Sequence, residues 1–256
     1  MSGNAREPGR SVLSRAHALL TAYDADHRQL TLTELSERSG LALSTCHRLV
    51  GELCGADWLS RSPDGTYRVG HALFELGVHA PAYGEVRRLA LPYLSELSFE
   101  TGENVQLGVL DNDEVLYLER LVGRRSVPLV SFPGTRLPLH CTGVGKAMLA
   151  TLPDEHVRRV LSRPLRRFTS HTITAPGALL REVRAIRERG YAFTREEMSL
   201  GAFSVAMTLR ATDDGAPLAV GVTVRRISRT PAATADRLRR TVELIDAELI
   251  ATRGAF

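Results

Sequence analysis

The sequence predicts an α+β protein in two parts: a helical N-terminal domain with a small β-hairpin, and a C-terminal domain built on an antiparallel sheet. Three stretches before residue 54 carry apolar residues at helical spacing. A Pro-Asp-Gly turn at 63–65 then separates two short runs that favour strands. From Glu103 onward the apolar spacing changes to two, which is typical of strands with one buried face.

Three helices are expected in the first domain. Residues 11–20 predict the first helix, with four side chains turned inward: Val12, Ala16, Leu19 and Leu20. Thr31 can cap a second helix, which Gly40 ends. A third helix is expected at 44–53, where one apolar stripe has offsets of 0, 3, 4 and 7 and consists of Cys46, Leu49, Val50 and Leu53. That stripe should face the core of the domain.

A hairpin is expected after the third helix, with strands at 58–61 and 66–69. Helix, tight turn, second helix and hairpin are the order of parts in a winged helix-turn-helix, whose second helix enters the major groove of DNA. DNA binding is therefore the leading hypothesis for this domain. The candidate contacts are polar residues outside the stripe and two arginines beside the hairpin turn: Ser44, Thr45, His47, Arg48, Arg61 and Arg68.

The composition is that of an ordinary cytoplasmic protein of two domains. The chain has 256 residues, of which 43% are hydrophobic and 24% charged. It has no run of about 18 apolar residues and no apolar segment near the start, so we expect neither a membrane span nor a secretion signal. The three cysteines lack CxxC spacing and are expected to be free thiols. We expect no metal and no cofactor.

The charge of the chain points only weakly to a nucleic-acid partner. The formal net charge is +4, a value that many enzymes share. Residues 1–70 contain eight arginines and eight acidic residues, so the proposed DNA-binding domain is formally neutral. Affinity for phosphates must then come from individual arginines, from helix N-termini and from two copies that act together.

The chain is expected to comprise a disordered arm at 1–10, the winged helix-turn-helix domain at 11–70, a linker helix at 71–83 and the second domain at 84–256. The second domain should begin with an amphipathic helix at 86–97, which Pro92 would kink or start afresh. Further helices are expected near 143–150, 153–161, 176–189 and 231–250, and strands at 105–109, 115–119, 126–131, 191–194, 203–210 and 218–225.

Three motifs resemble those of the IclR-type transcriptional regulators. Residues 137–150, LPLHCTGVGKAMLA, are similar to the Pro-Leu-His…Gly-Lys-Ala signature of that family. Residues 186–192, IRERGYA, resemble the segment that precedes the ligand-pocket strands of the family, and residues 44–49, STCHRL, resemble its recognition helix. The motifs occur in the family's order, and the order of elements matches over nearly the full chain.

The resemblance implies a homodimer or homotetramer that binds double-stranded operator DNA through its N-terminal domains. It also implies a GAF-like second domain that binds a small metabolite, often a carboxylate or an aromatic compound. Matched position by position, the ligand pocket would be formed by Gly143, Val144, Thr194, Ala202, Ser204, Gly221 and Thr223. The sequence departs from the family pattern at Thr194, Ser204 and 221–223, and again at Leu43, where relatives often have a basic residue.

Several residues suggest other chemistry but fit it poorly. Residues 142–146 lack the glycine and the hydroxyl residue that a phosphate-binding loop requires. His140 and Cys141, neighbours on what reads as an extended segment, should point to opposite faces, so we expect them to be structural. Lys146, the only lysine of the chain, is expected to be solvated, and the acid-rich segment 194–197 to form a pocket rim. A solvated basic face is expected for Arg120, Arg124 and Arg125.

The favoured hypothesis is a ligand-responsive transcriptional regulator, either repressor or activator, in which ligand and operator affinities are coupled. One alternative is an enzyme that has acquired a winged-helix domain, since folds of the second type host several chemistries. No catalytic constellation in the sequence supports it. The other alternative is a protein-interaction module, in which the winged helix binds protein. The ligand and the operator stay open.

Overall fold

The computed structural model describes residues 11–24, 26–79, 83–210, 215–225 and 231–253. The arm expected at 1–10 and residues 80–82 of the expected linker lie outside them. The chain divides into two compact units, Met1–Pro81 and Ala82–Phe256. Each unit has a hydrophobic core of its own, and each is described here by itself.

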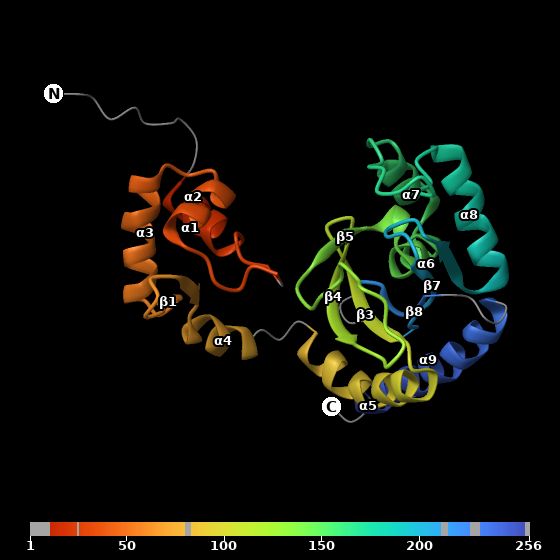
Figure 1. The fold of residues 1–256 in the computed structure, drawn as a ribbon. Helices are drawn as coiled ribbons and strands as arrows, with labels where there is room; N and C mark the ends of the chain where they lie inside the picture. The colour runs from red at the N-terminus through yellow and green to blue at the C-terminus, as the bar shows by residue number, and fades with distance from the viewer. Residues whose placement is uncertain (1–10, 25, 80–82, 211–214, 226–230, 254–256) are drawn as a thin grey trace. The chain divides into compact units, whose positions relative to one another are not determined.

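The first unit is a three-helix core with a two-stranded wing and a following helix (Figure 1). Its elements are α1 (Val12–Leu20), α2 (Leu32–Ser39), α3 (Leu43–Gly55), β1 (Leu59–Arg61), β2 (Tyr67–Val69) and α4 (His71–Val78). The stripe on α3 is buried as predicted, at Cys46, Leu49, Val50 and Leu53. Of the side chains expected inward on α1, Leu19 is fully buried, whereas Val12 is 54% exposed because it lies in the first turn, beyond the reach of the core.

The ends of α2 are fixed by its sequence. The Thr31 hydroxyl accepts a hydrogen bond from the amide of Glu34, and the Glu34 carboxylate accepts one from the amide of Thr31, at 2.7 Å. This is a capping box, which satisfies two amides that the helix itself leaves free. Gly40 ends the helix in the left-handed region at φ 65°, a conformation that glycine adopts without strain.

The wing is a tight antiparallel hairpin. Ser60 is paired with Arg68, and Arg61 with Tyr67. The amide of Ser62 donates to the carbonyl of Thr66 at 2.8 Å, and Gly65 takes a φ of 86° in the turn. Leu30 adds a short bridge to Tyr67, so the wing is joined to the segment before α2. The predicted Pro-Asp-Gly hairpin is therefore present.

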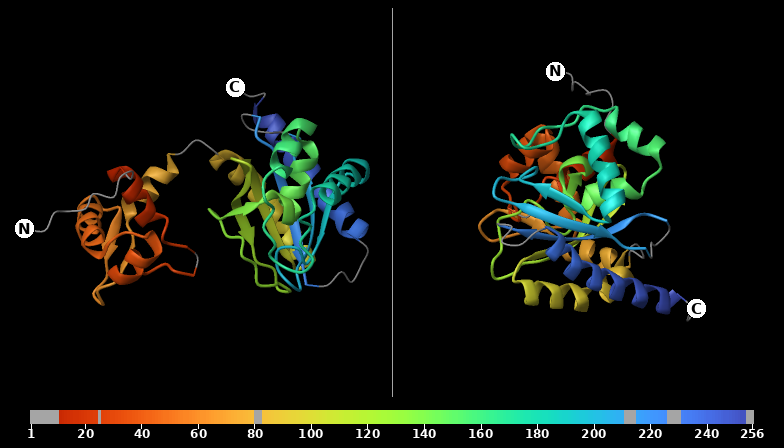
Figure 2. Two further views of the ribbon diagram at one scale, coloured as in Figure 1. Left: turned by 90° about the horizontal axis from the view of Figure 1, so that it is seen from above. Right: turned by 90° about the vertical axis from the view of Figure 1, so that its right-hand side faces the viewer.

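The second unit is a six-stranded antiparallel sheet between two layers of helices (Figure 2). The strand order is β5-β4-β3-β8-β7-β6. The strands are β3 (Asn104–Asp111), β4 (Glu114–Leu121), β5 (Arg136–Pro138), β6 (Ala192–Arg195), β7 (Phe203–Thr208) and β8 (Leu218–Val224). The fold class expected from the sequence is confirmed: a helix-turn-helix unit followed by an α/β unit with an antiparallel sheet.

Helices cover both faces of this sheet. The long helices α5 (Gly84–Thr101) and α9 (Pro231–Arg253) pack on one face, over a core that includes Leu107 and Val220. On the other face lie η1 (Leu139–Cys141), α6 (Gly143–Thr151), α7 (Asp154–Leu161) and α8 (Pro176–Arg189). The second layer places the start of α6 against the middle of the sheet, where the candidate ligand site is found.

A β-bulge in β4 determines which side chains reach that site. Gly108 is paired with Tyr117, whereas Leu107 is paired with Glu119, so one extra residue of β4 lies between these pairs. Side chains alternate between the faces of a strand, and a bulge shifts that alternation by one residue. As a result Tyr117 and Arg120 both belong to the α6 face, although the two residues between them would place them on opposite faces of a regular strand.

The prediction of a strand at 126–131 is wrong, and the edge strand is β5 instead. The 126–131 segment contains Pro128, which lacks an amide hydrogen for a ladder. Side chains bind its backbone: Asn104 Nδ2 donates to Val127 O at 3.0 Å, and Arg120 Nη1 donates to Ser131 O at 3.1 Å. The segment is therefore a loop tied to the face of the sheet.

Of the two outcomes expected at Pro92, a kink or a fresh start, the second does not occur, because α5 is one helix with Pro92 inside it and buried residues on both sides, Leu89 and Leu94 among them. Arg120 is also not part of a solvated face, unlike its exposed neighbours Arg124 and Arg125. Its guanidinium lies 4.5 Å from the ring centre of Phe132 and holds the 126–131 loop.

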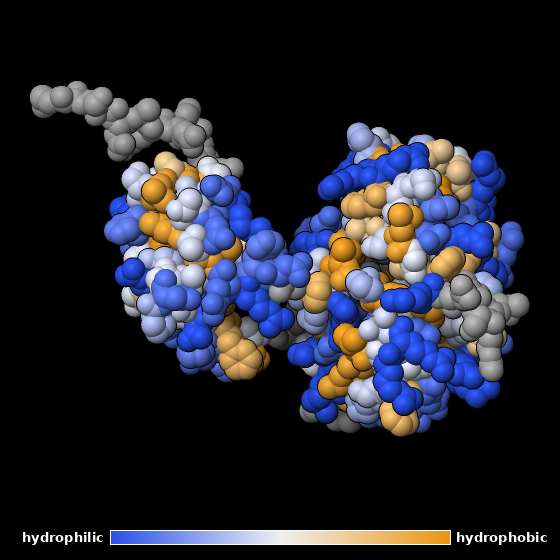
Figure 3. All heavy atoms as spheres, in the orientation of Figure 1, coloured by the Kyte–Doolittle hydropathy of each residue, from blue (hydrophilic) through white to orange (hydrophobic). Residues whose placement is uncertain are grey.

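The surface mixes hydrophobic and hydrophilic residues on each unit (Figure 3). Helix α4 differs from the other helices of the first unit because none of its residues is buried. Its apolar side chains Phe74, Leu76 and Val78 are 73%, 58% and 61% exposed. Since only Ala72 and Leu73 of this helix are even half-buried, it gains little hydrophobic stabilisation within its own unit.

Candidate functional site

The polar residues predicted to contact DNA share the outer side of α3. Ser44, His47 and Arg48 are exposed and Thr45 is half-buried, whereas the stripe that starts at Cys46 faces the core. Ala42 precedes the helix and provides no side-chain cap, so the first amides of α3 remain available to an acceptor. Free amides and exposed hydroxyls at a helix N-terminus suit phosphate and base contacts.

Arg48 is not isolated on this surface. Its Nη1 lies 2.5 Å from Oε1 of Glu52, one turn further along α3. Leu43, at the start of the helix, is 51% exposed and adds an apolar rather than a basic contact there. On the outer side of α3, the positive charge of Arg48 is therefore balanced by the negative charge of Glu52. The same balance of positive and negative residues holds for residues 1–70 as a whole.

The side chains of the two wing arginines, Arg61 and Arg68, project from opposite faces of the hairpin. Because Arg61 is opposite Tyr67 and Arg68 is opposite Ser60, their side chains alternate across the two-stranded sheet. The Arg61 guanidinium lies 5.8 Å from the Tyr67 ring centre, and Arg68 Nε donates to Ser60 Oγ at 2.9 Å. The wing therefore offers one cation on each side.

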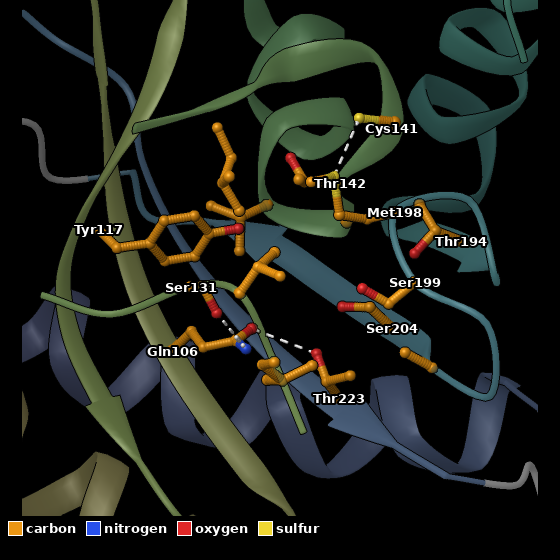
Figure 4. Close-up of a pocket in the computed structure, with 16 residues that line it drawn as sticks. Gln106, Tyr117, Ser131, Cys141, Thr142, Thr194, Met198, Ser199, Ser204 and Thr223 are labelled. Carbon is orange, nitrogen blue, oxygen red and sulfur yellow. Dashed lines mark hydrogen bonds between the residues drawn. The ribbon is translucent and has the colours of Figure 1, made fainter. Parts of the chain in front are cut away.

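The second unit has a pocket between the start of α6, the sheet and two loops (Figure 4). The space between its walls is about 440 Å³, a figure that includes open solvent at the mouth. Six of the seven predicted ligand-binding residues line it: Gly143, Val144, Thr194, Ala202, Ser204 and Thr223. Lining it as well are Gln106, Tyr117, Leu129, Val130, Ser131, Leu137, Cys141, Thr142, Met198 and Ser199.

Gly221, the seventh predicted residue, does not line the pocket. A Cβ at Gly221 would lie 2.8 Å from Val144 Cγ2, so the Val144 side chain covers it. Gly143 is required for a similar reason, since a Cβ there would lie 2.5 Å from Ser204 Oγ. The two glycines let α6 pack closely on β7 and β8, and only Gly143 reaches the pocket.

The start of α6 carries the strongest donors of the pocket. Thr142 caps the helix: its Oγ1 accepts from the amide of Gly145 at 3.1 Å and donates to Pro138 O at 3.1 Å. Among the residues that the structure describes, the amides of Gly143 and Val144 have no acceptor. Together with the positive end of the helix dipole they can bind a carboxylate.

Uncharged polar groups from the sheet form another part of the wall (Figure 4). Gln106 on β3 donates through Nε2 to Ser131 Oγ at 3.1 Å, and its Oε1 accepts from Thr223 Oγ1 at 3.2 Å. Gln106 is 4% exposed. No charged side chain lines the pocket within the described part of the chain.

Sequence motifs could not reveal several lining residues. Gln106 and Tyr117 reach the pocket through the register of β3 and β4, and Ser131 through the loop that replaces an expected strand. Burial raises the pKa of the Tyr117 hydroxyl above its ordinary value, an effect that a hydrogen bond with Thr142 partly opposes. Tyr117 is therefore a neutral hydrogen-bonding wall.

His140 and Cys141 are structural, as expected, although the reason given by the sequence was wrong. They lie in the 3-10 turn η1 rather than on an extended segment, and both are buried. His140 Nε2 lies 2.9 Å from Arg166 O, and burial lowers the pKa of the imidazole. Burial also raises the pKa of the Cys141 thiol to about 12, which makes it a poor nucleophile.

Lys146 reverses one expectation, because it is not solvated but completely buried, at 0% exposure. In the acid-rich segment 194–197, which was expected to form a pocket rim, Thr194 lines the pocket and Glu197 is 5% exposed. Lys146 Nζ and Glu197 Oε1 lie 2.5 Å apart. Lys146 is buried because α6 is covered on all sides by the rest of the second unit. A buried ammonium group requires a carboxylate partner, which another segment of the chain provides.

The described residues contain no group of three or more His, Cys, Asp or Glu side chains that could hold a metal ion. No helix among them is long and apolar enough to cross a membrane. A winged helix-turn-helix unit followed by a unit with a pocket at the start of a buried helix is typical of a transcriptional regulator of the ligand-binding class.

Comparison with known families agrees with that class. Residues 80–247 match the model of the bacterial transcriptional regulator IclR C-terminal domain, and residues 12–63 match the IclR helix-turn-helix domain. The chain belongs to the IclR family. Members of this family are transcriptional regulators and not enzymes, so the enzyme alternative is excluded.

Similar proteins cover almost the whole chain. The HTH-type transcriptional regulator Rv1719 of Mycobacterium tuberculosis is 34% identical over 94% of this chain and 93% of its own length. The regulator XynR of Escherichia coli is 32% identical over 76% of this chain and 78% of its own. An IclR homologue from Microbacterium hydrocarbonoxydans, solved in complex with 4-hydroxybenzoate, has a TM-score of 0.85 at 30% identity, covering 94% of this chain and all of that one.

Proposed function

We propose that this regulator binds operator DNA through α3 and the wing, and that a small acid in the pocket of the second unit changes its affinity for DNA. The observation that carries the proposal is the outer side of α3, where Ser44, His47 and Arg48 are exposed above a fully buried stripe. Thr45, Arg61 and Arg68 complete the proposed DNA-binding set. The same protein can act as repressor or activator, because the position of the operator decides whether DNA binding lowers or raises transcription.

The proposed effector is a small carboxylate or aromatic acid. The free amides of Gly143 and Val144 suit its carboxylate, and the neutral groups at Thr194, Ser204 and Thr223 suit its uncharged part. Apolar walls at Leu129 and Val130, with the Tyr117 ring, suit an aromatic or aliphatic body. The complex of the Microbacterium homologue with 4-hydroxybenzoate supports this class of ligand.

The proposed working form is a homodimer or homotetramer in the cytoplasm, where the DNA is. A formally neutral DNA-binding unit favours two copies on two half-sites, because each added phosphate contact strengthens binding. The exposed apolar side chains of α4 support an interface near the proposed 71–83 linker. We assign DNA binding to 11–70, and effector binding with oligomerisation to 84–256. Sedimentation at micromolar concentration tests the assembly, and a monomer would contradict it.

A gel-shift experiment tests the DNA-binding proposal. The full chain is titrated onto the DNA upstream of its own gene at several salt concentrations, with a scrambled duplex of the same length as control. Specific binding that weakens with salt is expected, because phosphate contacts release counterions. Binding that is absent, or that salt does not affect, would refute the proposal.

Effector binding is tested separately by thermal shift. Small carboxylates and aromatic acids, 4-hydroxybenzoate included, are screened at millimolar concentration, each against its amide as an uncharged control. A ligand that binds only the native state raises the melting temperature. A hit should then change the gel shift, and a hit that leaves DNA affinity unaltered would contradict the coupling.

One rival remains, in which the winged helix binds protein rather than DNA. Arg48→Ala separates the two. Loss of duplex binding with an intact fold supports the regulator, whereas unaltered DNA behaviour favours a protein-interaction module.

A further inference from the structure

Two walls of the pocket are joined by a buried ion pair. One wall is the start of α6, and the other is the loop between β6 and β7, residues 196–202, which contributes Met198, Ser199 and Ala202. Lys146 lies on α6 one turn after the free amides of Gly143 and Val144, and Glu197 lies in the loop next to Met198. The 2.5 Å contact between them therefore links the helix of one wall to the loop of the other.

This pair differs from every other ion pair among the described residues in its burial. Lys146 and Glu197 have side-chain exposures of 0% and 6%, whereas all the other pairs have at least one partner that is a quarter or more exposed. Within the described residues, Glu197 Oε2 is buried and no hydrogen bond to it meets the usual geometry, although the backbone amide of Ile173 also interacts with this carboxyl group. A buried pair with one unsatisfied oxygen gains little stability over an apolar pair of similar size. Its presence calls for a role other than stability.

The remaining contacts of the loop show what that role is. Thr169 Oγ1 donates to Glu196 O and Thr172 Oγ1 to Glu197 O, each at 2.7 Å, so two threonines tie the loop to the outer segment at 169–172. These bonds fix the backbone where the loop begins. The side chain of Glu197 is the polar group that reaches inward to α6.

We propose that Lys146 and Glu197 are positioning residues that hold the 196–202 loop against α6, so that the pocket keeps its shape before a ligand enters. A pocket formed in advance binds its ligand without the entropic cost of ordering a wall. The meaning of this role for regulation rests on the proposed function, but the position of the loop can be measured without DNA or effector.

The chain contains a reporter for the loop. Cys141 is fully buried, and its Sγ lies 3.6 Å from Sδ of Met198. When the loop leaves α6, Met198 leaves with it and the thiol becomes accessible. Alkylation of Cys141 by iodoacetamide, read by mass spectrometry, therefore measures opening of the loop. Cys46, buried in the first unit, is the internal standard.

The decisive variant is the apolar pair Lys146→Met with Glu197→Leu. Because both charges leave together, no uncompensated buried charge remains, and the melting temperature should stay within a few degrees of wild type. The alkylation rate of Cys141 should nevertheless rise about tenfold, and the amides of 196–202 should exchange faster, while Cys46 keeps its rate. Asp154→Asn, which removes the half-exposed pair with Arg187, should alter neither readout.

Two results would overturn the proposal. One is a folded double variant in which Cys141 alkylation and loop exchange match wild type, since the pair would then have no positioning role. The other is a rise in the alkylation rate of Cys141 in Asp154→Asn that equals the rise in the double variant. If the double variant does not fold by circular dichroism, Lys146→Gln with Glu197→Gln, which also removes both charges but keeps two polar side chains, decides by the same two readouts. Failure of any of these leaves the DNA-binding proposal untouched, because neither DNA nor effector is present.

Discussion

Arg48 and Glu52 form an ion pair on the outer side of α3, with Nη1 and Oε1 2.5 Å apart. The two side chains are 55% and 57% exposed. An exposed pair at this helical spacing is worth about 0.3–0.5 kcal/mol. A DNA phosphate or a base edge can therefore replace Glu52 as the partner of Arg48, and Glu52 holds the guanidinium in a defined place until then.

The first prediction concerns this pair. Arg48→Ala should weaken operator binding by about 1–3 kcal/mol, because it removes the cation closest to the tip of the recognition helix. Glu52→Gln should strengthen binding slightly, by about 0.5 kcal/mol, because the competing carboxylate is gone. Fluorescence anisotropy with labelled operator measures both, and the salt dependence of Arg48→Ala tells phosphate from base contact.

Arg158→Ala is the matched control for Arg48→Ala. Arg158 is exposed on α7 in the second unit, so the substitution removes the same charge away from the proposed DNA surface. It should leave DNA affinity within twofold of wild type. An Arg48→Ala protein that binds as tightly as Arg158→Ala would remove α3 from the proposed interface.

The second prediction concerns the contact of Gly143 with Ser204. Gly143→Ala places a Cβ 2.5 Å from Ser204 Oγ and 3.0 Å from its Cβ, so α6 must shift away from β7. Such overpacking costs about 1–3 kcal/mol of unfolding free energy. Ser204→Gly removes both atoms and should restore most of the loss in the double variant. Urea unfolding of wild type, the two single variants and the double variant gives the coupling free energy between positions 143 and 204. Strictly additive changes in unfolding free energy would show that the two residues do not meet.

The third prediction concerns Gln106. Gln106→Leu leaves the hydroxyls of Ser131 and Thr223 without their partner, which should cost about 1–3 kcal/mol. The 126–131 loop should open more often, and trypsin should cut faster after the exposed Arg124 and Arg125. Asn112→Ala, in the exposed turn after β3, is the control. Equal cleavage rates in all three proteins would mean that Gln106 does not hold the loop.

The parts that the sequence predicted well have local causes. The stripe that begins at Cys46 follows from helical periodicity, and the ends of α2 follow from Thr31 and Gly40. The start of α6 was found because Gly143 and its neighbours form a motif. In these cases neighbouring residues alone decide the structure, so periodicity and capping rules suffice.

The parts that the sequence missed depend on contacts between distant residues. Lys146 is buried only because Glu197 lies 51 positions away in the chain and beside it in the fold. Arg120 reaches the α6 face through a bulge in β4, which no alternation pattern reveals. Gly221 was assigned to the pocket by position, but the Val144 side chain covers it. Pairing across a sheet is set by the whole fold.

The last prediction concerns Asp113. Its carboxylate contacts His156 and Arg159 of α7, and Arg163 just after the end of that helix. Asp113 Oδ1 lies 2.6 Å from His156 Nε2, and Arg159 and Arg163 approach the same carboxylate at 3.6 and 3.2 Å. Burial alone would raise the pKa of Asp113, but the hydrogen bond and electrostatic attraction of His156, together with the guanidinium charges of Arg159 and Arg163, outweigh it, so the pKa is lowered. A carboxyl whose pKa is lower in the folded than in the unfolded state stabilises the fold above its unfolded value of about 3.9.

That stabilisation is lost as the pH falls through the folded pKa, because both states then bind the proton. Asp113→Asn should therefore unfold at a lower urea concentration than wild type at pH 7. This difference in urea midpoint between the two proteins should shrink progressively below about pH 4. The comparison uses the difference between the two proteins at each pH, since other carboxylates titrate in both. Glu155→Gln, an exposed acid in the first turn of α7, serves as control. A gap that stays constant from pH 7 to pH 3 would show that Asp113 is not held ionised by α7.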